Sequence, residues 1–251
     1  STTAVTLANA AGAALDLNGF DQTIQSLSGG GGSGGAVTLG GAQLTVGSGN
    51  FAGSISGSGS LRKTSGGTLV LSGANSYAGE TWLTDGVLQV DGTHSRGGRY
   101  IVSSGATLGG RGGIEADVSV LNGGILSPGS SIGTLSVTGD VGLEGILKIE
   151  VMDLGGIGVA AADLLNVRGD LDITWATVDF DPSGVLEQDA YVFATYSSLT
   201  GGQFAKVFDL PDGYQIDYNY QGGNQIALVV PEPGTLVLLG LAAAGWARRR
   251  S

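Results

Sequence analysis

A short unit repeats along the first two thirds of the chain and limits its fold more than any other feature. The unit is a small residue, any residue and then leucine. Its leucines are Leu44, Leu69, Leu88, Leu108, Leu126 and Leu147, and Gly169-Asp170-Leu171 is a candidate seventh copy. Successive leucines from Leu44 to Leu147 differ by 25, 19, 20, 18 and 21 positions. A period near 20 residues is typical of solenoids, in which each copy forms one turn of a coil.

The residues between the leucines favour strands over helices. Glycine punctuates each copy, and short segments such as 68–72, 87–91, 135–138 and 146–151 are rich in leucine and β-branched residues. Leucine-rich repeats share this period but need an L-x-x-L-x-L core and a turn asparagine. We therefore predict an all-β coil with strands stacked ~4.8 Å apart. In this coil Leu69, Leu88, Leu108, Leu126 and Leu147 form an inward ladder on one sheet.

The composition divides the chain into a solenoid over residues 1–152 and a different segment over 153–230. The glycine-rich stretch 29–35 predicts a flexible loop or insertion within the solenoid. After residue 153 acidic and aromatic residues become denser, and longer alternating strands are expected at 191–196 and 225–230. Because the end of a solenoid needs a cap, we interpret 153–230 as a C-terminal capping β-subdomain.

Several function classes conflict with the residue content. The net charge is −11 and the basic residues cluster only at the end of the chain, which argues against nucleic-acid binding. There is no cysteine, and His94 is the single histidine, so thiolate and histidine-based metal sites are excluded. Two G-x-S-x-G matches, at Ser33 and Ser131, lack the strand–turn–helix context of a catalytic serine. We expect no catalytic residue, no cofactor and no metal.

Two pairs of aspartates give the strongest enzymatic alternative. Asp170 and Asp172, like Asp179 and Asp181, are two residues apart, so each pair shares one face of a strand. Glycosidases use paired carboxylates for acid–base and nucleophilic chemistry. The favoured interpretation is a solvated acidic face, and an acidic carbohydrate site is the alternative.

Residues 57–90 carry a motif series that identifies a family. They contain G-x-G-x-L-x-K, G-T-L-x-L-S-G, N-x-Y-x-G-x-T and G-x-L-x-V in this order. The series resembles the autotransporter-associated β-strand repeat, and residues 126–139 resemble a second element of the same passenger domains. The resemblance implies a right-handed parallel β-helix that is exported from the cell.

The last 21 residues, 231–251, have a second recognisable order. Pro231, Glu232 and Pro233 are followed by an apolar run over 234–247 and by Arg248, Arg249 and Arg250. This order resembles the PEP-CTERM sorting signal, which an exosortase processes in Gram-negative bacteria that make exopolysaccharide. A run of 14 residues forms a helix of ~21 Å, short for a bilayer span. We predict a short transmembrane helix with the arginines on the cytoplasmic side.

These features together predict an exported structural or adhesive protein of the cell surface or biofilm matrix, and not an enzyme. An exosortase-type enzyme is the expected processing partner, an exopolysaccharide is a candidate partner, and the inner membrane is a transient anchor. The alternative is a β-helix protein that binds or degrades a polysaccharide.

Overall fold

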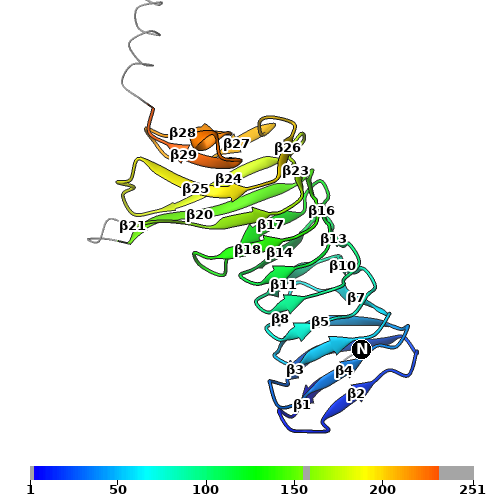
Figure 1. Cartoon of the computed structure of the whole chain (residues 1–251). Helices are drawn as coiled ribbons and strands as arrows, with labels where there is room; N and C mark the ends of the chain where they lie inside the picture. The colour runs from blue at the N-terminus through cyan, green and yellow to red at the C-terminus, as the bar shows by residue number, and fades with distance from the viewer. Residues whose placement is uncertain (1–2, 155–158, 232–251) are drawn as a thin grey trace, which may run out of the picture.

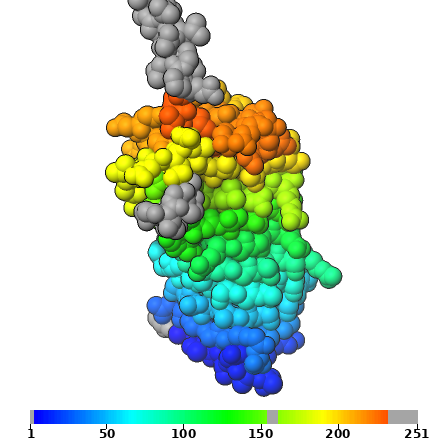
Figure 2. All heavy atoms as spheres, turned by 60° about the vertical axis from the view of Figure 1, so that its left-hand side comes forward, coloured from blue at the N-terminus to red at the C-terminus, as the bar shows by residue number. Residues whose placement is uncertain are grey.

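The computed structural model describes residues 3–154 and 159–231, which form an elongated stack of short strands (Figure 1). Figure 2 shows one continuous body with the N-terminal residues at one end and the last strands at the other. The helical element of the described residues is a 3-10 turn, Tyr220–Gly222. None of the helical structure in this part of the chain is long and apolar enough to cross a membrane. The predicted helix over 234–247 lies outside the described residues.

The chain coils through three faces in turn, which we call the tryptophan face, the leucine face and the third face. The tryptophan face consists of the first halves of β3 (Gln22–Gly29) and β5 (Gln43–Phe51), then β7 (Ser60–Lys63), β10 (Thr81–Leu83), β13 (Tyr100–Val102), β16 (Val118–Val120), β19 (Val141–Leu143), β23 (Asp170–Asp172) and β26 (Ser198–Thr200). The leucine face consists of β1 (Ala4–Leu7), the second halves of β3 and β5, then β8 (Thr68–Leu71), β11 (Gly86–Val90), β14 (Ala106–Gly110), β17 (Ile125–Pro128), β20 (Ile146–Leu154), β24 (Thr177–Ser183) and β27 (Lys206–Phe208). The third face consists of β2 (Ala14–Asp16), β4 (Ala36–Thr38), β6 (Ser54–Ser56), β9 (Ala74–Asn75), β12 (Thr93–His94), β15 (Gly113–Ile114), β18 (Thr134–Val137), β22 (Leu164–Val167) and β25 (Ala190–Thr195).

Strands of successive turns pair in parallel on each face, so the described residues form a parallel β-helix. This confirms the prediction of an all-β coil. Most strands alternate a buried apolar residue that points inward with a partly exposed residue that points outward, as in β18 and β22. Stacking then places inward residues of neighbouring turns on one another.

The predicted leucine ladder is confirmed on the leucine face. Leu69 pairs with Leu88, Leu88 with Leu108, Leu108 with Leu126 and Leu126 with Leu147, and all five are fully buried. The two outer copies of the repeat unit do not belong to this ladder. Leu44 and Leu171 lie on the tryptophan face, where they pair with Leu61 and Val141. The ladder continues through Val178, which is fully buried, and ends at Val207, which pairs with Val178 and is 38% exposed.

The glycine-rich stretch 29–35 is a loop at a corner of the coil, which agrees with the first of the two predicted alternatives. A β-carbon on Gly29, whose φ is +86°, would lie 2.1 Å from the carbonyl oxygen of Leu7. One on Gly34 would lie 1.8 Å from the carbonyl oxygen of Ala10. Asn9 Oδ1 also accepts a hydrogen bond from the Ser33 amide at 2.9 Å. Glycine is required here because the corner packs directly on the turn below.

The parallel ladders run past the proposed boundary at residue 153. β24 pairs in parallel with β20, and β27 pairs in parallel with β24, so the coil extends to Phe208. The cap is smaller than the segment 153–230. It consists of β28 (Gln215–Asp217) and β29 (Gln225–Val229), which pair antiparallel with each other, while β29 also pairs antiparallel with β25. A second antiparallel strand, β21 (Val159–Ala162), folds back on β20.

Aromatic residues fill the capped end, as the sequence suggested. Phe193 contacts Phe180 edge-on and stacks with Phe204, and Tyr191 contacts Tyr214 edge-on. The tyrosine hydroxyls at this end have hydrogen-bond partners: Tyr191 Oη donates to Asp153 Oδ1 at 2.7 Å, and Tyr196 Oη donates to the carbonyl oxygen of Tyr218 at 2.6 Å. Large rings with satisfied polar tips close the core where stacking of turns ends.

Candidate functional site

The four aspartates of the alternative acidic site lie on two different faces. Asp170 and Asp172 belong to β23 on the tryptophan face, whereas Asp179 and Asp181 belong to β24 on the leucine face. Each pair shares a strand face as predicted, because a buried residue separates its members. The two pairs do not meet in one centre. In the described part of the chain, no three Asp, Glu, His or Cys residues gather closely enough to hold a metal ion.

Local partners occupy most of these carboxylates. Asp170 Oδ1 accepts hydrogen bonds from Ser198 Oγ at 2.8 Å and Thr200 Oγ1 at 3.3 Å. Asp181 Oδ2 lies 3.1 Å from Lys148 Nζ, an ion pair whose side chains are 55% and 41% exposed. These contacts join neighbouring turns on the surface of the coil. They agree with the interpretation of the aspartates as a solvated acidic face.

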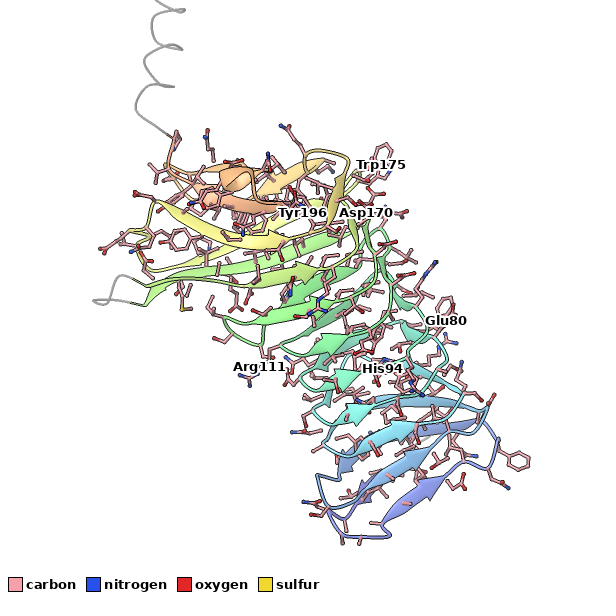
Figure 3. The ribbon with its side chains drawn as sticks, in the orientation of Figure 1. Glu80, His94, Arg111, Asp170, Trp175 and Tyr196 are labelled. Carbon is pink, nitrogen blue, oxygen red and sulfur yellow. The ribbon has the colours of Figure 1, made fainter. Side chains whose placement is uncertain are left out.

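His94 lies inside the coil and is 1% exposed (Figure 3). Its ring stacks on that of Tyr77 and meets that of Tyr100 edge-on. Its Nε2 is 2.9 Å from the carbonyl oxygen of Tyr77, and its Nδ1 is 2.6 Å from the hydroxyl of Tyr100. Because a carbonyl oxygen only accepts, Nε2 carries the proton and the Tyr100 hydroxyl donates to Nδ1. Burial lowers the pKa of His94, although the bond to Tyr77 and the charge of Glu115 oppose the shift. The imidazole is therefore neutral, and both of its nitrogens are engaged by tyrosines.

Lys63, the lysine of the G-x-G-x-L-x-K motif, joins two corners of the coil. It occupies an inward position between Val46 and Leu83 and is fully buried. Its Nζ donates to three carbonyl oxygens, those of Thr64 at 3.1 Å, Ser65 at 2.7 Å and Asp85 at 3.0 Å. Burial lowers the pKa of Lys63, and the charge of Asp85 opposes this. The lysine thus has a structural role within its repeat.

A third buried polar residue, Asp163, fastens the loop between β17 and β18. Its Oδ1 accepts the amide of Gly133 at 3.0 Å and its Oδ2 accepts the amide of Glu150 at 3.1 Å. Burial raises the pKa of Asp163 to about 7, and the two amide hydrogen bonds oppose the shift. Within this loop Ser131 has a φ of +140°, a conformation that favours glycine. Asp163 therefore holds a strained loop against β20.

A hollow of about 240 Å³ opens beside the tryptophan face across three successive turns. Its floor is an outward column with one residue from each of β16, β19 and β23, namely Ser119, Gly142 and Asp172. Its wall comes from the corners that follow these strands, namely Leu121, Glu144 and Trp175. We call this feature the Trp175 hollow.

Two exposed apolar side chains border the Trp175 hollow. The Trp175 side chain is 71% exposed and that of Leu121 is 40% exposed. Figure 3 shows Trp175 pointing away from the coil on the side that also carries Glu80, opposite Arg111. Asp172 is fixed at the edge, because its Oδ1 accepts hydrogen bonds from both the amide and the hydroxyl of Thr174. The hollow therefore combines an open indole ring with one carboxylate that is held in place.

The sorting residues begin where the hydrogen bonds of the cap end. The Val230 amide donates to the carbonyl oxygen of Asp189 at 2.9 Å, and Pro231 follows it. Glu232, Pro233 and the arginines Arg248, Arg249 and Arg250 lie outside the described residues.

Comparison with known proteins agrees with both resemblances. The passenger-associated-transport-repeat model matches residues 61–90, and the PEP-CTERM protein-sorting motif model matches residues 229–251. The Adhesin BmaC autotransporter of Brucella suis biovar 1 (strain 1330) is 46% identical over 128 residues, which are 49% of this chain and 4% of the adhesin. An Extracellular serine protease of Serratia marcescens is 43% identical over 103 residues, which are 40% of this chain and 10% of the protease. The chain thus spans a small part of the length of each relative.

Sequence reasoning missed Lys63, Asp163 and the Trp175 hollow. Lys63 had a detectable signal, since it stands two residues after the inward Leu61 and so takes an inward position. The Trp175 hollow had no sequence signal. Its floor residues are separated by corners and strands of unequal length, so no fixed spacing connects them.

Proposed function

We propose that this chain is an exported structural or adhesive protein of the cell surface or exopolysaccharide matrix of a Gram-negative bacterium. The observation that carries the proposal is the position of the PEP-CTERM match, residues 229–251, directly after the cap. The pairs of β29 with β25 and β28 end at Val229, so cleavage near Pro231 leaves the cap complete.

The sorting signal acts as a transient anchor in this proposal. The apolar run 234–247 enters the inner membrane, and Arg248, Arg249 and Arg250 stay on the cytoplasmic side. An exosortase-type enzyme then cuts near Pro231, Glu232 and Pro233 and releases the body. Removal of the three arginines leaves the body more acidic, and mutual repulsion keeps released copies from pairing through exposed strand edges.

The coil serves display rather than catalysis. The Brucella relative is named an adhesin, and a rigid rod of stacked turns suits a role that presents a surface away from the cell. We propose that the chain is not an enzyme, because its aspartate pairs lie on separate faces and bond to neighbouring turns. A polysaccharide-degrading activity would need paired carboxylates across one bound sugar.

Intact-mass measurement of protein from the culture surface tests the proposal. We expect a mass that ends near residue 231 in the parent strain and a longer, membrane-bound form in a strain without exosortase. A matrix form that keeps Arg248–Arg250 in both strains would refute the proposed processing.

Incubation of the purified protein with neutral and acidic polysaccharides should give no new reducing ends. Turnover that disappears in Asp170→Asn or Asp179→Asn would instead establish an enzyme.

A further inference from the structure

We propose that the Trp175 hollow binds a neutral, extended polysaccharide chain, with one sugar ring stacked on Trp175. The proposal rests on the proposed function in that it supplies the matrix partner of the exported coil. Its observations are the exposed indole, the hollow beside it and the charge of the lining residues.

The exposed indole supplies the apolar platform. A side chain as large as Trp175 seldom stays 71% exposed, and Leu121, which lines the same hollow two turns away, is 40% exposed. Together with Glu144 these residues follow the coil axis at successive corners. An aromatic face binds the C–H face of a pyranose ring, which is apolar, while the ring's hydroxyls remain at its edge.

The missing side chain of Gly142 makes the hollow. Its neighbours in the outward column, Ser119 and Asp172, carry side chains, so the column dips at its middle turn. A β-carbon added to Gly142 would meet no described atom within 4 Å, which shows open space above the backbone. The three turns repeat at ~4.8 Å, a spacing close to the repeat of an extended sugar chain. A chain lying along the coil axis therefore meets equivalent positions on successive turns.

The charges select a neutral sugar. Glu144 and Asp172 are the charged residues of the lining, and both are acidic. Carboxylate oxygens accept hydrogen bonds from sugar hydroxyls, but they repel uronate or sulfate groups. The net charge of −11 adds to this repulsion at long range.

Calorimetric titration of the purified full chain tests the site, with cellohexaose and mannohexaose as neutral probes and hexagalacturonate as the acidic probe. We expect one of the neutral probes to bind and hexagalacturonate to bind less well. Trp175→Ala should weaken binding roughly tenfold, the loss typical of an aromatic anchor. Gly142→Val should weaken it similarly, because valine fills the hollow and suits a strand. Glu144→Gln should improve the relative binding of hexagalacturonate.

Trp82→Ala is the matched control. Trp82 is also exposed on the tryptophan face, at 38%, but it lies outside the hollow and donates to Glu80 Oε2 at 2.9 Å. Its loss should change binding less than twofold, a threshold set by ordinary surface substitutions. The proposal is overturned if no neutral probe binds, if hexagalacturonate binds best, or if Trp175→Ala and Gly142→Val leave affinity unchanged. Protein that is processed and exported but does not bind refutes this site alone, whereas protein that binds but is not processed refutes the proposed function alone.

Discussion

Replacing Lys63 by methionine tests whether the motif lysine stabilises the coil through its three carbonyl contacts. Lys63→Met keeps the unbranched apolar stem between Val46 and Leu83, and it removes the ammonium group from Thr64, Ser65 and Asp85. A buried acceptor that loses its donor costs roughly 1–3 kcal/mol. Ser65 and Asp85 are themselves exposed, so water can replace part of the lost contacts of their carbonyl groups, and removal of the ammonium also abolishes the cost of burying it. We expect a net loss of about 2 kcal/mol in the free energy of unfolding.

Urea denaturation followed by circular dichroism measures this loss, with Lys148→Met as the matched control. Lys148 forms an exposed ion pair with Asp181, a class of contact worth about 0–1 kcal/mol. Lys63→Met should therefore lower the unfolding midpoint clearly more than Lys148→Met does. Equal midpoints for the two variants would refute the reasoning that Lys63 holds the corners together.

Three further predictions concern the core. Leu108→Ala should lower the free energy of unfolding by roughly 2–5 kcal/mol in urea titration, because Leu108 is fully buried in the leucine ladder; a loss no larger than that of the outward control Thr107→Ala would contradict this. The pKa of His94 is lowered in the folded chain, so the unfolded chain binds more protons below pH 6.5; the His94 contribution to stability should therefore fall as pH drops below 6.5, by up to about 1.4 kcal/mol per pH unit, and His94→Gln should remove this contribution from the pH slope. Asp163 has a pKa raised from 3.8 to about 7, so its contribution should have the opposite sign, with stability falling as pH rises between those values. An Asp163→Asn variant whose pH slope equals that of the parent would refute this assignment.

The sequence alone determined the class of the fold and the nature of its C-terminal end. A period near 20 with alternating apolar residues permits few solutions other than stacked strands, so the leucine ladder from Leu69 to Leu147 followed from spacing. The sorting signal at 231–251 was visible because its information is contiguous. Strand positions at 191–196 and 225–230 were likewise local, and β25 and β29 occupy them within one residue.

Only the tertiary structure decided on which face of the coil each residue lies and which outward residues of neighbouring turns come together. Leu44 and Leu171 match the repeat but lie on the tryptophan face, because alternation marks a residue as inward without saying toward which sheet. Asp170 and Asp179 share a spacing pattern yet lie on different faces for the same reason. The Trp175 hollow joins Ser119, Gly142 and Asp172, which register brings together across loops of unequal length. Stacking order sets these contacts, and it arises from the pairing of whole turns, which no local pattern encodes.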